Sequence, residues 1–267
     1  MDQNLIAVLL GIIEGLTEFL PVSSTGHMII VGHVLGFEGN VATIFEIVIQ
    51  LGAILSVLVL YKDKFLHFLT KEGWQVNRGL SGIHIAAGIV PTMLFAYLVH
   101  SFIQAHLFSP FTVAIGLVLG AILMFCAERH ITGREEYLVN DVDKITVKQA
   151  TLIGFFQFLS LWPGFSRSGS TIGGALFVGV SRKAAADFSF IMAVPVMFVA
   201  CIYELLKNMK MLNAGDFQML GIGFVVAFIV AYYSIVWFMS FLNKSTLTSF
   251  AVYRVLLAAV TLWYFYM

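Results

Sequence analysis

Two acidic residues near the N-terminus, Glu14 and Glu18, lie four positions apart in the otherwise apolar segment GIIEGLTEFLP. On a helix this spacing places both carboxylates on one face. There they could hold a divalent cation together, or one could act as a base beside its partner. An isolated acidic pair of this spacing is ordinarily a solvated helix face, but the apolar neighbours favour a functional site.

A short run of hydroxyl side chains and a histidine follow the acidic pair. Ser23, Ser24 and Thr25 precede His27, and His27 comes nine residues after Glu18. We expect one turn of the chain between these two residues, which would bring them within reach of each other. A lone histidine in an apolar segment is usually a packing residue, but this company indicates a role in proton transfer.

A second polar run, PGFSRSGST at residues 163–171, has the composition of an anion site. Proline and glycine end the incoming helix, and a new helix is expected to begin near Ser170, so that its N–H groups and positive dipole end face the run. Arg167 adds a planar pair of donors suited to two phosphate oxygens. Ser166, Ser168 and Thr171 add hydroxyl groups. The alternative is that Arg167 pairs with Glu14 or Glu18 for stability alone, which would bring the same two segments together.

These two groups of residues together predict phosphoryl transfer. One supplies acidic groups and a nucleophile, and the other supplies a phosphate cradle. No P-loop, G-x-G-x-x-G run or zinc-ligand spacing occurs in the sequence, so nucleotide binding and zinc-dependent hydrolysis lack support.

The composition places these residues in a membrane. The 267 residues are 60% hydrophobic and 11% charged, with a mean hydropathy of +0.93. A soluble domain of this size could not cover so much apolar surface. The net charge is zero and no basic cluster occurs, so nucleic acid is not expected as a partner.

Few charged residues remain at membrane depth, and such residues tend to mark function. They are Glu14, Glu18, Glu46, Arg167, Asp187, Glu204 and Arg254, with His27 beside them.

Six apolar stretches are long enough to cross a hydrocarbon core, which takes about 17 to 25 residues. They are residues 41–61, 82–102, 110–127, 184–206, 217–242 and 249–267. Two further stretches, 5–37 and 149–180, are interrupted by LPVSSTGH and WPGFSRSGST. Non-helical backbone at membrane depth must line a cavity or be buried in protein, so we expect two re-entrant helical hairpins at a functional site.

The two interrupted stretches match each other at an offset of 143 residues. Gly11 falls on Gly154, Ser23 on Ser166 and Gly26 on Gly169, and the register continues into the following helix. This predicts an internal duplication. One membrane domain, 1–267, would then contain repeat one at about 1–127, a cytoplasmic loop at 128–148 and repeat two at about 149–267.

Each repeat contains one hairpin and three crossings, an odd number, so the second repeat must enter the membrane upside down. The expected fold is an all-α polytopic membrane protein with an inverted-topology repeat. Basic residues favour cytoplasmic loops and give the orientation. Eleven lie in the loops assigned inside, against two outside, Lys207 and Lys210. Both chain ends and the mouth of the first hairpin would then face outside. The N-terminal MDQN lacks the basic region of a cleaved signal.

The motifs EGLTEFLPVSSTGH and PGFSRSGST resemble the two signatures of the undecaprenyl-diphosphatase family of the bacitracin-resistance type. The resemblance covers essentially the whole chain. It implies hydrolysis of undecaprenyl diphosphate to undecaprenyl phosphate and phosphate, which recycles the lipid carrier of bacterial cell-wall synthesis. It also implies the bacterial cytoplasmic membrane, an active site open to the external or periplasmic face, and stimulation by Mg²⁺ or Ca²⁺.

The resemblance also implies residue roles. Glu14 and Glu18 correspond to the family's acidic motif and are the candidate metal ligands, and Ser24 and His27 correspond to its nucleophile and proton-transfer residue. Arg167 with Ser166, Ser168 and Thr171 corresponds to its diphosphate clamp. Ser23 and Thr25, on either side of Ser24, are expected to bind substrate together with Glu14. A serine attack assisted by a base, a direct imidazole attack and an activated water all fit these residues. The partners expected are the polyprenyl diphosphate lipid, the bilayer and a second copy of the chain in a homodimer.

Two other classes of protein compete with this interpretation. Inverted repeats with broken helices are typical of secondary transporters, so the chain could instead flip a polyprenyl phosphate. An intramembrane serine protease is a weaker rival, because the Ser168–Gly169 pair lacks a partner helix carrying a catalytic histidine. A nucleophile, a base and a phosphate clamp together exceed what transport requires.

Overall fold

The computed structural model describes residues 2–208, 212–213 and 215–267, and apart from an isolated bridge between Val139 and Val180 these residues form helices and their connections. The α-helices are α1 Gln3–Thr17, α2 Ser24–Leu35, α3 Asn40–Leu60, α4 Lys62–Phe68, α5 Gly82–His106, α6 Pro110–Ile131, α7 Val147–Gln157, α8 Arg167–Phe177, α9 Arg182–Asn208, α10 Asp216–Leu242 and α11 Thr248–Tyr266. Short 3₁₀ helices are η1 Glu72–Trp74, η2 Val76–Arg78, η3 Glu135–Tyr137, η4 Val142–Lys144 and η5 Phe158–Leu161.

Six of the described helices are long and apolar enough to cross a membrane: α3, α5, α6, α9, α10 and α11. They coincide with the six predicted crossings, and the all-helical multi-pass fold is therefore confirmed. The helix boundaries differ from the predicted ones by a few residues, because polar end residues such as Arg129 and Arg182 continue a helix beyond its apolar part. Lys210, counted above among the external basic residues, lies outside the described part of the chain.

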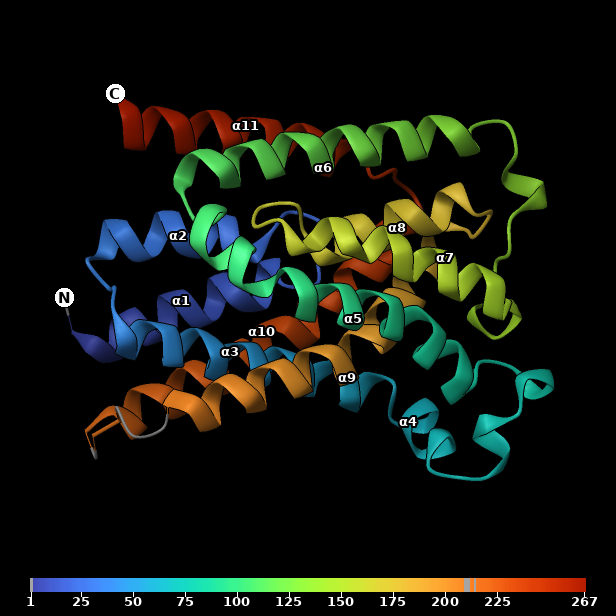
Figure 1. Cartoon of the computed structure of the whole chain (residues 1–267), viewed down its shortest axis with the longest axis horizontal. Coiled ribbons are helices and arrows are strands. Elements are labelled where there is room, and N and C mark those ends of the chain that lie inside the picture. The colour runs from blue at the N-terminus through green and yellow to red at the C-terminus, as the bar shows by residue number, and fades with distance from the viewer. Residues whose placement is uncertain (1, 209–211, 214) are drawn as a thin grey trace.

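Each of the two interrupted segments forms a helical hairpin. In the first, α1 and α2 are joined by a turn over residues 18–23, and in the second, α7 and η5 are followed by a turn that leads into α8. Gly164 has a φ of 89° in that turn, a conformation that glycine adopts without strain. Figure 1 shows the first hairpin extending from the end of the molecule that carries both termini, and the second from the opposite end.

The outer arms of both hairpins cross a long helix at a pair of glycines. Gly11 of α1 meets the backbone of Gly223 in α10, and Gly154 of α7 meets the backbone of Gly88 in α5. A methyl group at Gly11 or Gly154 would overlap the facing carbonyl oxygen, so only glycine allows this approach. Two equivalent crossings thus fix the two hairpins against the long helices.

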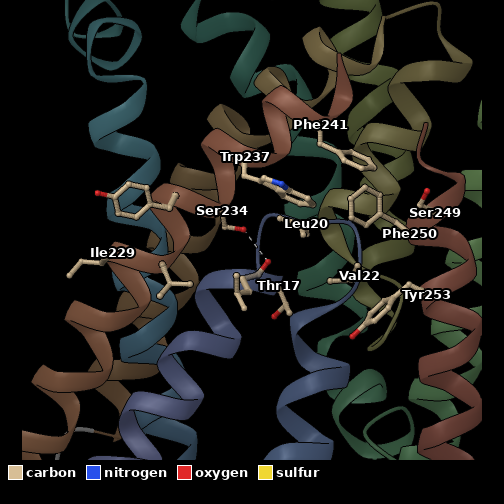
Figure 2. Close-up of a pocket in the computed structure, with 13 residues that line it drawn as sticks. Thr17, Leu20, Val22, Ile229, Ser234, Trp237, Phe241, Ser249, Phe250 and Tyr253 are labelled. Atoms are coloured by element: carbon tan, nitrogen blue, oxygen red, sulfur yellow. Dashed lines mark hydrogen bonds between the residues drawn. The ribbon is translucent and has the colours of Figure 1, made fainter. Parts of the chain in front are cut away.

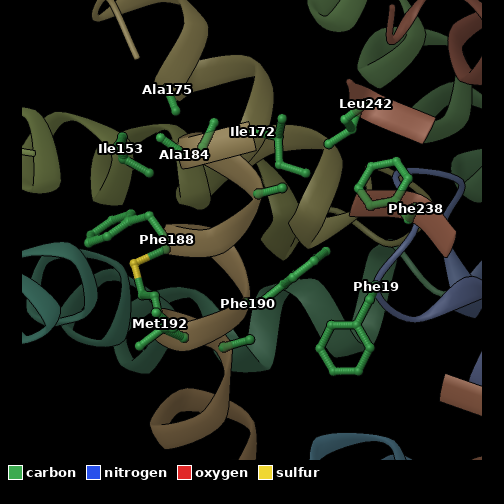
Figure 3. Packing of buried hydrophobic residues seen from close by; sticks show 14 of the residues in the cluster. Phe19, Ile153, Ile172, Ala175, Ala184, Phe188, Phe190, Met192, Phe238 and Leu242 are labelled. Carbon is green, nitrogen blue, oxygen red and sulfur yellow. The ribbon is translucent and has the colours of Figure 1, made fainter. Parts of the chain in front are cut away.

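The core surrounds the tips of the hairpins. Phe19, in the first tip, is completely buried and its ring meets that of Phe190 from α9 edge-on at 5.4 Å. Phe190 also lies 6.1 Å from Phe238 of α10, and Figure 3 shows these rings together in the packed centre. Aromatic packing therefore anchors the first tip to the helices of the second half.

Candidate active site

The two tips enclose a small polar cavity of about 150 Å³. Both hairpins and the helices α3 and α9 contribute to its wall, as Glu18, Ser23, Ser24, Thr25, Gln50, Ser160, Trp162, Pro163, Gly164, Ser166, Arg167 and Met197. Most of the residues predicted from the sequence line this cavity. His27 and Glu14 do not, and Ser168 and Thr171 lie behind the wall.

A serine with an unusual backbone conformation precedes the inner helix of each hairpin. Ser23 and Ser166 both have a φ of 70°, and among the described residues no other non-glycine residue has a positive φ. Each hydroxyl accepts a hydrogen bond from the N–H three residues on, that of Gly26 at 3.4 Å and of Gly169 at 3.1 Å. Such strain persists where the surrounding structure imposes it, often at functional sites. It turns the chain so that each helix begins at the cavity.

Ser24 and Arg167 consequently occupy equivalent places, each as the first residue of its helix. They converge on one carboxylate. The Ser24 hydroxyl donates a hydrogen bond to Oε2 of Glu18 at 2.7 Å, and Nη2 of Arg167 donates to Oε1 at 3.3 Å. The side chain of Glu18 is only 6% exposed and that of Arg167 12%, so little water screens the pair.

Arg167 has further partners that fix its plane. Nη1 donates to the carbonyl oxygen of Ser189 at 3.3 Å, and the guanidinium lies 5.6 Å from the centre of the Phe19 ring. Its Nε is buried and without a partner in the described part of the chain. The alternative given above was an ion pair of Arg167 with Glu14 or Glu18, and the pair with Glu18 is present. By itself this ion pair is compatible with phosphate binding and with stability. The orphaned donor and the place in the cavity wall favour anion binding.

The other predicted hydroxyls have different surroundings. Ser168 donates to the carbonyl oxygen of Leu20 at 2.9 Å, which ties the second tip to the first. Ser166 lies 3.1 Å from Ser168 and lines the cavity. Thr171 is completely buried and bonds the hydroxyl of Ser189 at 2.6 Å. Thr25 is exposed at the cavity wall and is free to meet a ligand.

His27 is not placed against Ser24 or Glu18. Its Nδ1 lies 2.8 Å from the carbonyl oxygen of Ser23, and its Nε2 lies 2.6 Å from the hydroxyl of Tyr253 on α11. A carbonyl only accepts, so Nδ1 carries the proton and Nε2 of the neutral ring accepts from Tyr253. In this geometry the ring of His27 is hydrogen-bonded to the backbone of Ser23, the residue before Ser24.

Glu14 is buried on the first hairpin, and its charged neighbours are Glu18 and Glu46. No group of three or more histidine, cysteine or acidic side chains suited to a metal occurs among the described residues. Two carboxylates nevertheless suit Mg²⁺ or Ca²⁺, hard cations that often complete their coordination with phosphate oxygens and water. Glu14 and Glu18 are therefore the residues that would hold such a cation.

Three residues with evident roles were assigned none from the sequence. Ser189 positions Arg167 and Thr171, Tyr253 bonds His27, and Arg254 contacts both tips. Arg254 gave a signal, as a cation at membrane depth without an acidic partner on its helix. Ser189 and Tyr253 gave none, because serine and tyrosine are common in apolar helices and their contacts are long-range.

A second, larger cavity of about 750 Å³ lies beside the first tip, between α10 and α11. Its wall includes Leu16, Leu20 and Val22 of the tip, and Figure 2 shows Trp237, Phe241 and Phe250 on its upper side. Tyr253 lines it as well. The lining is almost entirely apolar, in contrast to the polar cavity on the other face of the same tip.

Comparison with known proteins gives concordant matches. Residues 7–260 match the family described as bacitracin resistance protein BacA. The chain is 47% identical over 259 residues to undecaprenyl-diphosphatase 1 of a Bacillus cereus strain, covering 97% of each chain. It is 46% identical over 259 residues to undecaprenyl-diphosphatase 1 of a Bacillus thuringiensis strain, again over 97% of each.

Proposed function

Because this chain belongs to the bacitracin resistance protein BacA family, we propose that it hydrolyses undecaprenyl diphosphate to undecaprenyl phosphate and inorganic phosphate. Both relatives are named for that activity, and each aligns with this chain over 97% of its length. Neither match favours the flippase alternative. One observation in the site carries the chemistry. A hydroxyl and a guanidinium from different hairpins bind the two oxygens of one buried carboxylate.

In the first step, Oγ of Ser24 attacks the terminal phosphorus of the diphosphate. Its proton passes to Oε2 of Glu18, to which it is already hydrogen-bonded at 2.7 Å. The bond between this phosphorus and the bridging oxygen breaks, and undecaprenyl phosphate leaves with the electron pair. Arg167 binds the oxygens of the transferred group, where charge is spread in the transition state.

Glu18 then gives its proton to the departing undecaprenyl phosphate and is a carboxylate again. In the second step, water attacks the phosphoserine and loses a proton to Glu18. The bond between phosphorus and Oγ breaks, Glu18 returns the proton to Oγ, and phosphate leaves as the Ser24 hydroxyl reforms. Direct attack by His27 fits less well, because both ring nitrogens have other partners. We assign His27 a positioning role. Water activated directly by Glu18 is the remaining alternative, and a phosphoserine would distinguish the two routes.

A divalent cation, Mg²⁺ or Ca²⁺, would be held by Glu14, Glu18 and the diphosphate. When bound, it would neutralise charge on the phosphate groups. Two more residues belong to the substrate site in this proposal. Ser23 and Thr25 line the polar cavity on either side of Ser24 and would meet the distal phosphate.

The architecture proposed is an inverted-topology repeat with two re-entrant hairpins. The paired φ values of Ser23 and Ser166 support the repeat, and so do the close helix crossings at Gly11 and Gly154, because both pairs of residues recur at the predicted offset. The short arms support re-entry: α1 has 15 residues and α2 has 12, and a full crossing takes about 20. The lipid's isoprenoid chain would be accommodated by apolar surface such as the cavity beside the first tip.

The location proposed is the bacterial cytoplasmic membrane, with the polar cavity open to the external or periplasmic face. The concentration of lysine and arginine in the loops 62–81 and 128–148 supports this orientation. A homodimer stays an expectation, which light scattering of the purified protein would test.

Phosphate release by purified protein in detergent tests the function. A hydrolase releases phosphate from undecaprenyl diphosphate without a membrane separating two compartments, whereas a flippase does not. Movement of a labelled polyprenyl phosphate across a vesicle bilayer, without phosphate release in detergent, would instead support transport.

A further inference from the structure

Arg254 of α11 is a completely buried cation that contacts the backbone of both hairpin tips. Nη1 donates to the carbonyl oxygen of Pro21 in the first tip at 3.4 Å. Nη2 donates to the carbonyl oxygens of Gly164 at 2.9 Å and Phe165 at 2.7 Å in the second tip. One side chain therefore joins two segments that are more than 140 positions apart in the sequence.

The remaining contacts of Arg254 fix it to α6. Nε donates to the carbonyl oxygen of Leu117 at 3.1 Å, and Nη2 also reaches that of Gly116 at 3.2 Å. No ion pair to Arg254 occurs in the part of the chain that the structure describes. A buried charge is costly unless polar groups satisfy it, and here the carbonyl groups of three segments do so.

The surroundings are shaped for a guanidinium. A methyl group on Gly169 of α8 would lie 2.7 Å from Nη1 of Arg254, and one on Gly120 of α6 would overlap Nη2. Both positions hold glycine, and the space that a side chain would occupy is taken by the arginine.

We propose that Arg254 is a positioning residue that sets Ser24 and Arg167 opposite each other by binding the carbonyl groups of both tips. Ser24 follows Pro21 by three residues, and Arg167 follows Phe165 by two. The carbonyl groups of both tips point toward Arg254 on α11. The N–H groups at the starts of α2 and α8 therefore face the cavity, which is the proposed site of the substrate phosphate. The role in turnover rests on the proposed hydrolysis, whereas the anchoring of the tips does not.

The test is Arg254→Lys in the full-length purified protein, with Arg182→Lys as the matched control. Arg182 is partly buried, and it binds Glu128 at a distance from the tips. Lysine keeps the charge but cannot reach both tips with a planar fork. We expect Arg254→Lys to lower kcat at least about tenfold with KM within about threefold, because misplaced reacting groups slow the chemical step.

Hydrogen exchange measured by mass spectrometry reads out the anchoring without substrate. Segments 18–26 and 160–169 should both exchange faster in Arg254→Lys than in the wild type, and neither should change in Arg182→Lys. A kcat within about twofold of the wild type, or unchanged exchange at the tips, would overturn the proposal. If the wild type releases no phosphate but the tips still exchange faster in Arg254→Lys, the anchoring role is supported and the proposed function is contradicted.

Gly169→Ala decides the matter if Arg254→Lys does not fold. This substitution keeps the cation, favours helix α8 and places a methyl group 2.7 Å from Nη1 of Arg254, with no other neighbouring atom closer than 3.3 Å. The same fall in kcat and the same faster exchange at both tips are expected. A folded Gly169→Ala protein with normal kcat and normal exchange would contradict the positioning role.

Discussion

Ser24 and Arg167 bind different oxygens of the same carboxylate, that of Glu18, at 2.7 and 3.3 Å. Each is the first residue of an inner hairpin helix, and each follows a serine with a φ of 70°. Equivalent backbone places in the two halves of the chain thus hold unlike side chains. Because these two places converge on one carboxylate, the proposed nucleophile and the proposed phosphate-binding group face each other.

Glu18→Gln removes the proposed base and keeps the shape of the side chain. We expect kcat to fall by about 10² to 10⁴-fold, the usual contribution of acid–base catalysis, with a smaller change in KM. Glu38→Gln is the control, since Glu38 is an exposed carboxylate that pairs with His33. Steady-state phosphate release by both variants measures the effect. A Glu18→Gln protein with near-normal kcat would show that Ser24 needs no base at this position.

Arg167→Lys keeps the charge and loses the planar pair of donors. We expect kcat/KM to fall by about 100-fold, a magnitude typical for removal of a preorganised donor to a developing charge. Thermal unfolding in detergent should change little. Normal turnover by a stable variant would support the alternative that Arg167 only stabilises the contact between the tips.

Tyr253→Phe removes the hydroxyl that donates to His27. If His27 acts by holding Ser23, then Tyr253→Phe and His27→Ala should each lower kcat by about fivefold, the worth of one hydrogen bond near 1 kcal/mol. The double variant should lose little more than either single variant. Additive losses in log kcat would mean that the two residues act independently.

The sequence predicts that Glu18 and His27 lie within reach of each other, and a second double-mutant cycle tests whether they act together. If the losses in log kcat caused by Glu18→Gln and His27→Ala are not additive, the two residues act together. Independent losses would agree with the geometry, in which His27 is turned toward α11.

Asp143 offers a pH-dependent test of stability outside the membrane-spanning helices. Partial burial alone would raise the pKa of Asp143, but hydrogen bonds from Lys64 and the Leu80 N–H lower it below its usual value. A carboxyl with a lowered pKa in the folded state stabilises the protein above its unfolded pKa, and the effect is lost as pH falls through the folded value. Asp143→Asn should therefore destabilise at pH 7 by about 1 kcal/mol or less, since the pair is partly exposed.

The difference between Asp143→Asn and the wild type should narrow as the pH is lowered below 4. Thermal unfolding at several pH values measures it. A difference that is the same at every pH would mean that the carboxyl is not more acidic in the folded protein.

Apolar run length made the helical fold predictable, because six uninterrupted stretches had the span of a bilayer and the structure contains six matching helices. The motif residues were predictable as well, since charge and hydroxyl groups stand out against an apolar background. Their pairing was predictable only in part. Pairing of Arg167 with Glu14 or Glu18 was one of two alternatives, and the structure has the pair with Glu18. The contact of His27 with Tyr253 was not predictable, because it joins residues 226 positions apart. Short-range periodicity contains no information on such contacts.

The contacts of Arg254 could not be predicted from the sequence either. Its cost at membrane depth marked it as significant, but its partners are carbonyl groups, which every residue has. No pattern of side chains could have named them.

Phosphate release from undecaprenyl diphosphate by the wild type and by Ser24→Ala, in detergent, tests the central claim most directly. Thr25→Val serves as the neighbouring hydroxyl control, and intact-mass spectrometry during turnover looks for one added phosphoryl group. The account predicts phosphate release by the wild type, partial loss in Thr25→Val, near-complete loss in Ser24→Ala, and a phosphorylated protein only where Ser24 is present. A wild type that releases no phosphate, or a folded Ser24→Ala protein that releases it at the wild-type rate, would contradict it.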